Sequence, residues 1–277
     1  MSALWLALAM FTVAPVPGRL VPMATRATAG RALRWLPLVG AGLGLLASAT
    51  ATVFWHPVSW AGATGSSPFV GAVVAIATLV LLTRGLHLDG LADVADGLGS
   101  RRPAEEALVI MKQSDIGPFG VAALVLALLV QVASLTTVFA ASTLAQGWVL
   151  LAAAQAAGRF AALDAAAPSV PSARPQVEGG FGALVTGTAS LSTRLVVGLV
   201  GLAVCLATAG LAGFSLRGVA EFAAVLLLSS LAARLLRRHC VRRLGGVTGD
   251  VFGALIETGA TVVLLGSAAV VGWSGGW

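Results

Sequence analysis

Charged residues are scarce in this chain. Of its 277 residues, only 10% are Asp, Glu, Lys or Arg, whereas 58% are hydrophobic. A soluble domain usually carries about 25% charged residues, so this chain has too little polar surface to cover a core in water. The scarcity of charge therefore excludes an ordinary soluble domain. Together with apolar runs of roughly 20 residues, it predicts an all-α polytopic membrane protein.

Cysteine and lysine are rarer still. The two cysteines, Cys205 and Cys240, form no CxxC pair, which excludes a disulfide framework and a zinc site of the usual spacing. The net charge of +6 raises the question of nucleic-acid binding. However, the arginines lie at the ends of apolar runs, where basic residues anchor membrane helices. We therefore expect a lipid bilayer as a partner, and no nucleic acid.

Eight apolar segments divide the chain. The first, residues 3–16, is short and ends in APVPG. We interpret it as a short N-terminal membrane segment, re-entrant or interfacial, and leave a full crossing open. The other seven are long enough to cross a bilayer; they are residues 36–55, 68–86, 118–141, 146–166, 194–214, 219–236 and 252–273. The pattern predicts a single integral-membrane domain over residues 1–277, a helix bundle with about seven transmembrane helices.

The loops between these segments alternate in charge. Loops 17–35, 87–117, 167–193 and 234–250 are basic, whereas the intervening loops contain one arginine, Arg217. If the segments alternate across the bilayer, all the basic loops lie on one side, which the positive-inside rule identifies as the cytoplasm. Most of the chain's eleven acidic residues lie in or beside the same loops. We therefore expect a multi-pass protein of the cell membrane with cytoplasmic catalytic loops.

The stretch HLDGLADVADG, residues 87–97, concentrates acids in this acid-poor chain. Asp89, Asp93 and Asp96 are spaced i, i+4, i+7, so on a helix they project within about 60° of one another. Such carboxylates repel one another unless a cation lies between them, and Mg²⁺ prefers oxygen ligands. The alternative is an acidic helix start in solvent. At a membrane boundary we favour the metal site. His87 is a base, a ligand or an interfacial histidine.

A second stretch, RRPAEEALVIMKQSDIGPFG at residues 101–120, predicts a short helix followed by a tight loop. Lys112, the only lysine, and Ser114 precede Gly117, where another apolar helix begins. Backbone N–H groups at such a helix start can hold a phosphate. The alternative is an amphipathic connector at the membrane surface.

A third stretch, RRLGGVTGDVFGALIE at residues 242–257, predicts a glycine-rich loop that opens a helix near Gly249. Asp250 can bind a metal or cap that helix. Glu257 follows on nearly the same helical face, two turns into a membrane helix, where an acid is costly without a partner or function. The alternative is an ordinary helix cap with glycines for close packing.

Together the three stretches resemble the cobalamin synthase family, the adenosylcobinamide-GDP ribazoletransferases of the late vitamin B12 pathway. Weaker similarities in FTVAPVPG, PLVGAGLG and GRFAALDAAAPSVPSARPQVEGGFG extend the resemblance along nearly the whole chain. There are departures. The family often has an acid at the position of Gln113, two places before Asp115, and a second glutamate at the position of Ala260.

The resemblance implies a Mg²⁺-dependent enzyme that joins adenosylcobinamide-GDP to α-ribazole, or to its 5′-phosphate, and releases GMP. We expect metal ligation by Asp89, Asp93 and Asp96, with Asp250 and Glu257 as further candidates. His87 or Asp93 would remove a proton. Phosphate binding is expected from the basic and glycine-rich positions Arg101, Arg102, Lys112, Ser114, Gly117 and Gly249.

Two other functions are weighed against this interpretation. A CDP-alcohol phosphotransferase would continue as Asp-Gly-x-x-Ala-Arg, but Asp93 follows Asp89-Gly90 without that Ala-Arg pair. A transporter would place acids near the bilayer midplane and repeat its helices in paired halves, whereas most acids here lie at one face. A homo-oligomer is left open.

Overall fold

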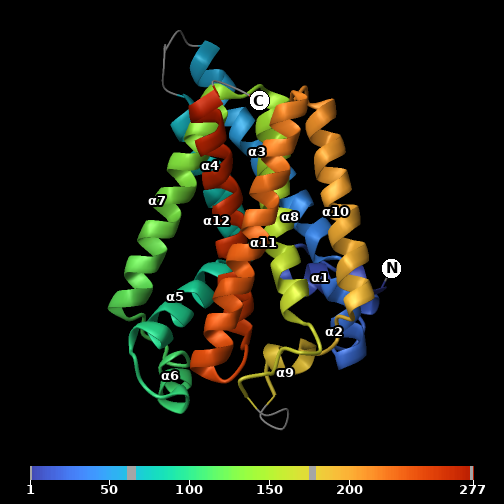
Figure 1. The fold of residues 1–277 in the computed structure, drawn as a ribbon, viewed down its shortest axis with the longest axis vertical. Helices are drawn as coiled ribbons and strands as arrows, with labels where there is room; N and C mark the ends of the chain where they lie inside the picture. Colours follow the sequence, from blue (N-terminus) through green and yellow to red (C-terminus); the bar gives the residue numbers. More distant parts are fainter. Residues whose placement is uncertain (1, 61–66, 175–178, 275–276) are drawn as a thin grey trace.

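The computed structural model describes the chain apart from residues 1, 61–66, 175–178 and 275–276, and the described residues form helices and no strand (Figure 1). This confirms the predicted all-α class. The helices are α1 (Ser2–Phe11), α2 (Arg26–Leu33), α3 (Leu36–Trp60), α4 (Ser67–Thr83), α5 (Leu86–Gly99), α6 (Ala104–Ile110), α7 (Pro118–Ala141), α8 (Leu144–Ala165), α9 (Phe181–Val185), α10 (Leu191–Leu211), α11 (Leu216–Leu244) and α12 (Gly249–Ser274), with a 3₁₀ turn, η1 (Gly18–Leu20), between α1 and α2.

Helices α8 and α12 form the centre of the bundle. Helix α8 packs against α3 on one side and α12 on the other, and α12 also contacts α5, α7 and α11. The two central helices approach closely where Gly158 faces Gly259. A Cβ at Gly259 would lie only 2.9 Å from the Cα of Gly158. Small residues allow membrane helices to gain van der Waals contact at such crossings. The apolar core therefore lies along the length of α8 and α12.

Five helices are long and apolar enough to cross a membrane: α3 over Leu36–Val53, α7, α10, α11, and α12 over Gly249–Trp273. Helices α4 and α5 qualify only as a pair, bent by 89°. The chain is thus a multi-pass membrane protein, but it has five or six such helices among the described residues rather than about seven. Helix α1 has 10 residues, or about 15 Å of length, and is the short N-terminal segment expected.

Two features account for the difference in number. Helix α8 is long enough to cross, but it is less apolar because it contains Gln146, Gln155, Arg159 and Asp164. These polar side chains are buried inside the bundle. The predicted segment 68–86 ends early because the backbone turns at Arg84 and Gly85, which both have positive φ. After this turn α5 runs at nearly a right angle to α4, so we treat α5 as lying along the end of the bundle rather than across the bilayer.

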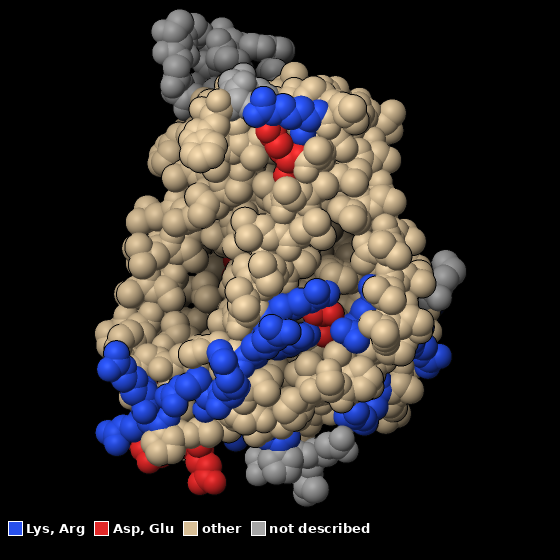
Figure 2. Space-filling view, in the orientation of Figure 1, with Lys and Arg blue, Asp and Glu red and all other residues tan. Residues whose placement is uncertain are grey.

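One end of the bundle gathers the charged loops. Helices α2, α5, α6 and α9 and the connection from α11 to α12 lie at this end, whereas the chain's C-terminus lies at the other (Figure 1). A band of Lys and Arg side chains crosses one face of the molecule near the same end (Figure 2). We call it the charged end. Its composition agrees with the predicted alternation of basic and non-basic loops.

Candidate active site

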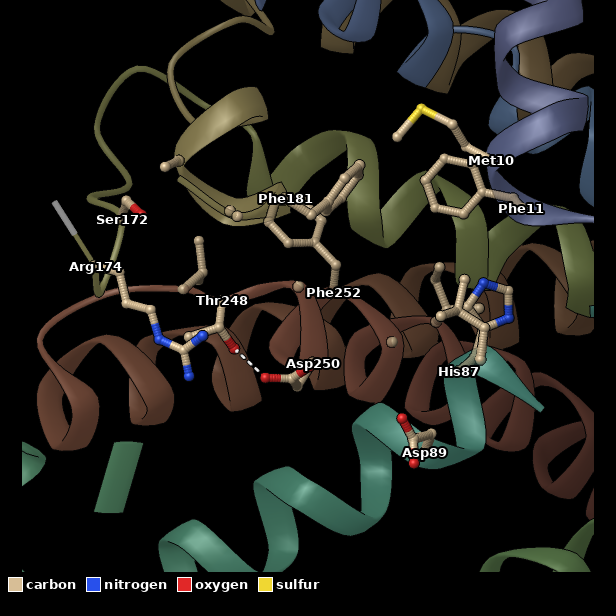
Figure 3. Close-up of a pocket in the computed structure, with 18 of the residues that line it drawn as sticks. Met10, Phe11, His87, Asp89, Ser172, Arg174, Phe181, Thr248, Asp250 and Phe252 are labelled. Atoms are coloured by element: carbon tan, nitrogen blue, oxygen red, sulfur yellow. Dashed lines mark hydrogen bonds between the residues drawn. The ribbon is translucent and has the colours of Figure 1, made fainter. Parts of the chain in front are cut away.

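A cavity of about 350 Å³ lies at the charged end, between α5, α9, α12 and the end of α1 (Figure 3). We call it the acidic cavity. Its polar lining comes from His87, Asp89, Ser172, Arg174, Thr248 and Asp250, and its aromatic wall from Phe11, Phe181 and Phe252. The cavity therefore combines the first and third sequence motifs with the loop that precedes α9.

Helices α5 and α12 meet through glycines. A Cβ at Gly90 would lie 2.6 Å from the carbonyl oxygen of Asp250, and a Cβ at Gly253 would lie 3.1 Å from the carbonyl oxygen of His87. Side-chain carbons essentially never approach backbone oxygen as closely as the first distance. Only glycine at position 90 therefore lets the two helices cross here, and the crossing brings Asp89 and Asp93 of α5 near Asp250 of α12.

The acids at this crossing form no ion pair among the described residues. Among the described residues, the carboxylates of Asp89 and Asp93 accept no hydrogen bond and form no ion pair, while Asp250 accepts a 3.1 Å hydrogen bond from the Thr248 hydroxyl. Burial, followed by the charges of Asp250, Asp89 and Asp96, raises the pKa of Asp93 to about 7. The site concentrates negative charge, and a bound cation would relieve the repulsion.

The donor set fits a magnesium ion shared with a substrate. No three His, Cys, Asp or Glu side chains in the described part of the chain converge closely enough to hold a metal ion by themselves. Mg²⁺, however, is commonly held by one or two carboxylates plus substrate phosphates and water. Asp89 and Asp250 can supply the carboxylates. Arg174 lies beside Asp250 in the same cavity (Figure 3) and can bind phosphate oxygens.

Asp96 has a different position from the other two aspartates of its motif. It is buried, and its two oxygens accept hydrogen bonds from the backbone N–H groups of Gly117 (2.8 Å) and Gly120 (2.9 Å). Asp96 therefore caps the start of α7. The N–H group of Gly117, which we expected to hold a phosphate, donates to this carboxylate instead. Metal binding by Asp96 stays a prediction.

The predicted phosphate-binding side chains of the second motif lie on the surface. Arg101, Arg102, Lys112 and Ser114 are exposed, and none of them lines the acidic cavity. Arg102 forms an ion pair with Glu106 at 3.6 Å, and the Ser114 hydroxyl donates to Asp115 at 3.2 Å. This placement matches the alternative of a surface connector. Phosphate binding by these residues stays a prediction.

The third motif divides between the cavity and the core. Gly249 and Asp250 line the acidic cavity, whereas Glu257 lies two turns further along α12 and outside it. An oxygen of Glu257 accepts a 2.9 Å hydrogen bond from the side-chain amide of Gln131. Glu257, Gln131 and the fully buried Arg159 line a separate space of about 20 Å³, which is enough for roughly one water molecule.

His87 lies between these two spaces, because it lines both of them. Its side chain is buried, and its Nε2 atom has no hydrogen-bond partner among the described residues. Burial, with a smaller contribution from Arg159, lowers the pKa of His87 well below its usual value. The imidazole is therefore neutral at pH 7, and it connects the acidic cavity with the buried polar cluster around Glu257.

Arg174 was not among the site residues expected from the sequence. Its position is fixed by two loops that pair: the Ala173 N–H donates to the Val247 carbonyl at 3.1 Å, and the Val247 N–H donates to the Pro171 carbonyl at 3.0 Å. These bonds bring Arg174 beside Thr248 and Asp250. The available signal was a single arginine in the loop PSARPQVEGGFG, on the same side of the membrane as the acidic motifs.

The fold and the acidic cavity define a polytopic membrane protein with an acidic, phosphate-compatible site at one end of its helix bundle. A family model described as Cobalamin-5-phosphate synthase matches residues 3–268. No solved structure matches the chain.

Curated relatives named adenosylcobinamide-GDP ribazoletransferase match at nearly full length. The Frankia casuarinae protein is 40% identical over 96% of this chain and 94% of its own. The Brevibacillus brevis protein is 34% identical, over 96% and 97% respectively. The Stutzerimonas stutzeri protein is 36% identical, over 98% and 100%. The chain belongs to the cobalamin-5-phosphate synthase family, which confirms the resemblance seen in its motifs.

Proposed function

We propose that this chain is an adenosylcobinamide-GDP ribazoletransferase. It transfers the adenosylcobinamide phosphate of adenosylcobinamide-GDP to α-ribazole, or to its 5′-phosphate, and releases GMP. Family membership and the names of the relatives support this activity. The single observation that supports the site is the convergence of Asp89, Asp250 and Arg174 on one cavity, with Asp93 beside them. Family membership also disfavours the phosphotransferase and transporter alternatives.

The reaction exchanges a phosphoanhydride bond for a phosphate ester bond. An oxygen of the ribose hydroxyl attacks the cobinamide-side phosphorus, the bond from that phosphorus to the bridging oxygen breaks, and GMP leaves with that oxygen. Mg²⁺ held by Asp89 and Asp250 would neutralise the pyrophosphate. Arg174 donates hydrogen bonds to phosphate oxygens, bidentately where geometry permits. The aromatic wall excludes water from the reacting groups.

Asp93 is the better candidate for removing the hydroxyl proton. Its carboxyl is only half-buried, and a pKa of about 7 suits a general base that acts near neutral pH. The Nε2 atom of His87 is instead buried without a partner among the described residues. We therefore propose a structural role for His87, as part of the wall between the acidic cavity and the polar cluster around Glu257. Lys112, on the exposed loop, keeps its predicted role in phosphate binding.

The proposal is tested by GMP release from the purified full chain in liposomes. We expect GMP only when adenosylcobinamide-GDP, α-ribazole and Mg²⁺ are all present, and none in EDTA. Asp89→Asn should lower the rate by roughly 10²-fold or more. Asp115→Asn is the matched control, because it removes the same charge from an exposed loop outside the cavity. A folded wild-type protein that releases no GMP would contradict the proposed function.

We propose that the acidic cavity faces the cytoplasm, and the positive-inside rule supports this orientation. This orientation can be tested with a membrane-impermeant thiol reagent on intact cells, in a background where Cys205 and Cys240 are replaced by serine. Arg217→Cys, at the other end of α11, should be labelled in intact cells. Lys112→Cys should be labelled only after lysis. The reverse pattern would place the cavity outside.

A further inference from the structure

A second charged site lies at the membrane boundary, away from the acidic cavity. The carboxylate of Asp164 on α8 binds Arg194 of α10 at 2.9 Å, Arg234 of α11 at 3.1 Å and Arg237 of α11 at 2.9 Å. Arg237 also donates to the backbone carbonyl of Asp164 at 2.9 Å. One carboxylate faces three guanidinium groups, and no other acid pairs with them among the described residues. The cluster therefore carries an excess of positive charge.

An apolar groove of about 370 Å³ extends from this cluster, between α8, α10 and α11. Arg194 and Arg234 line one end of the groove. From Arg194 its lining continues along α10 to Cys205, a length of about 16 Å at the helical rise. The side chain of Arg234 is 50% exposed and that of Arg194 is 18% exposed. The groove thus has a cationic end at the membrane boundary and an apolar body within the bilayer.

The protein itself leaves this groove open. Helix α10 packs mainly against α8 and α11, and only 6% of its span is buried inside the protein. A Cβ added at Gly201, which lines the groove, would meet no atom within 4 Å. An apolar groove inside the bilayer is occupied by lipid tails, so its specificity depends on the two arginines at its end.

We propose that the groove binds one anionic phospholipid. The phosphate lies against Arg194 and Arg234, and an acyl chain lies along α10. Basic pockets between membrane helices near the cytoplasmic boundary recognise anionic head groups in this way, and a guanidinium group binds phosphate oxygens in a planar fork. The groove shares no lining residue with the acidic cavity, so this inference does not depend on the proposed reaction.

The test is lipid binding by the full chain, measured by native mass spectrometry in detergent with either phosphatidylglycerol or phosphatidylcholine. We expect one phosphatidylglycerol molecule to bind more tightly than phosphatidylcholine. Replacing both groove arginines, Arg194→Gln and Arg234→Gln, should weaken phosphatidylglycerol binding roughly tenfold and abolish the preference. Asp164 keeps Arg237 as a partner in this variant. Arg238→Gln is the matched control, an exposed arginine on α11 that does not line the groove.

A second variant tests the apolar body without touching the arginines. Gly201→Leu fills the groove, so we expect it to weaken binding of both lipids. We expect its melting temperature to equal that of the wild type, which would show that the fold is intact. Any of four results would overturn the inference: equal binding of the two lipids by the wild type, wild-type binding by the double variant, wild-type binding by Gly201→Leu, or equally tight binding of glycerol 3-phosphate. The last would identify a site for a soluble phosphate instead of a lipid.

Discussion

Asp164 and Asp250 lie near the same end of the bundle but have opposite surroundings. Asp164 is enclosed by three arginines that form ion pairs with it. Asp250 lies near two other aspartates, receives one hydrogen bond from Thr248, and has only Arg174 as a basic neighbour, with no ion pair among the described residues. An acid with several cationic partners stabilises a structure, and removing it leaves buried positive charges unpaired. Acids that repel one another store unfavourable energy, which a bound cation would release. The surroundings therefore distinguish a structural carboxylate from a candidate functional one.

The largest expected effect comes from Asp250→Asn. The substitution removes a cavity carboxylate while keeping its shape, so GMP release should fall by roughly 10²- to 10⁴-fold. The melting temperature in detergent should stay the same or rise, because like-charge repulsion is reduced. Steady-state kinetics and thermal melting measured on the same preparation separate the two effects. If the melting temperature fell together with the activity, Asp250 would be a structural carboxylate like Asp164.

Asp164→Asn should show the opposite pattern. Removing the charged partner of three arginines at a buried position costs about 3–5 kcal/mol of folding free energy, so the melting temperature should fall markedly. The kcat of the fraction that remains folded should change little, since Asp164 does not line the acidic cavity. Activity normalised to folded protein provides the check. A stable but inactive variant would show that Asp164 has a role in the reaction.

Gly90→Ala tests how the acidic cavity is assembled. The added Cβ would lie 2.6 Å from the Asp250 carbonyl oxygen, so α5 and α12 must separate, at a cost of about 1–3 kcal/mol. We expect lower stability and weaker metal dependence of GMP release. Gly42→Ala is the control, because a Cβ there meets no atom within 4 Å. It should be neutral or slightly stabilising. Equal effects at both positions would argue against the close crossing.

The smallest expected effect is on pH dependence. Because neighbouring acids and burial raise the pKa of Asp93 to about 7, ionisation costs the folded protein free energy. Without metal, the protonated Asp93 therefore stabilises the folded protein at low pH, and this stabilisation is lost as the pH rises through 7. Deprotonation should have the opposite effect on function, so GMP release should rise over the same range. Higher Mg²⁺ concentrations should move the midpoint of that rise to lower pH. A midpoint that ignores Mg²⁺ would separate Asp93 from the metal.

The helical membrane class and the family could be predicted from the sequence. The surroundings of each acidic residue could not. Asp89, Asp93 and Asp96 have a regular spacing on one helix. That spacing cannot show that the amides of Gly117 and Gly120, from a distant segment, occupy both oxygens of Asp96. Arg174 was missed for a related reason, since its place beside Asp250 depends on pairing between two loops about 75 residues apart in the sequence.

The number of helices that pass a test of length and apolar composition is smaller than the predicted number for physical reasons as well. A hydropathy pattern cannot register the sharp turn at Arg84 and Gly85, which directs α5 along the end of the bundle. Nor does it distinguish a helix that faces lipid from α8, whose polar side chains face other helices. Tertiary contacts, rather than local composition, determine both features.

The central claim is that the unpaired acids of the acidic cavity bind a divalent cation, and direct cation binding tests it best. We would titrate the purified full chain with Mn²⁺, as a spectroscopic substitute for Mg²⁺, and count bound ions by electron paramagnetic resonance with pyrophosphate present. We expect saturable binding by the wild type and by Asp115→Asn, and at least roughly tenfold weaker binding by Asp89→Asn and Asp250→Asn. Identical binding by all four proteins would contradict the claim.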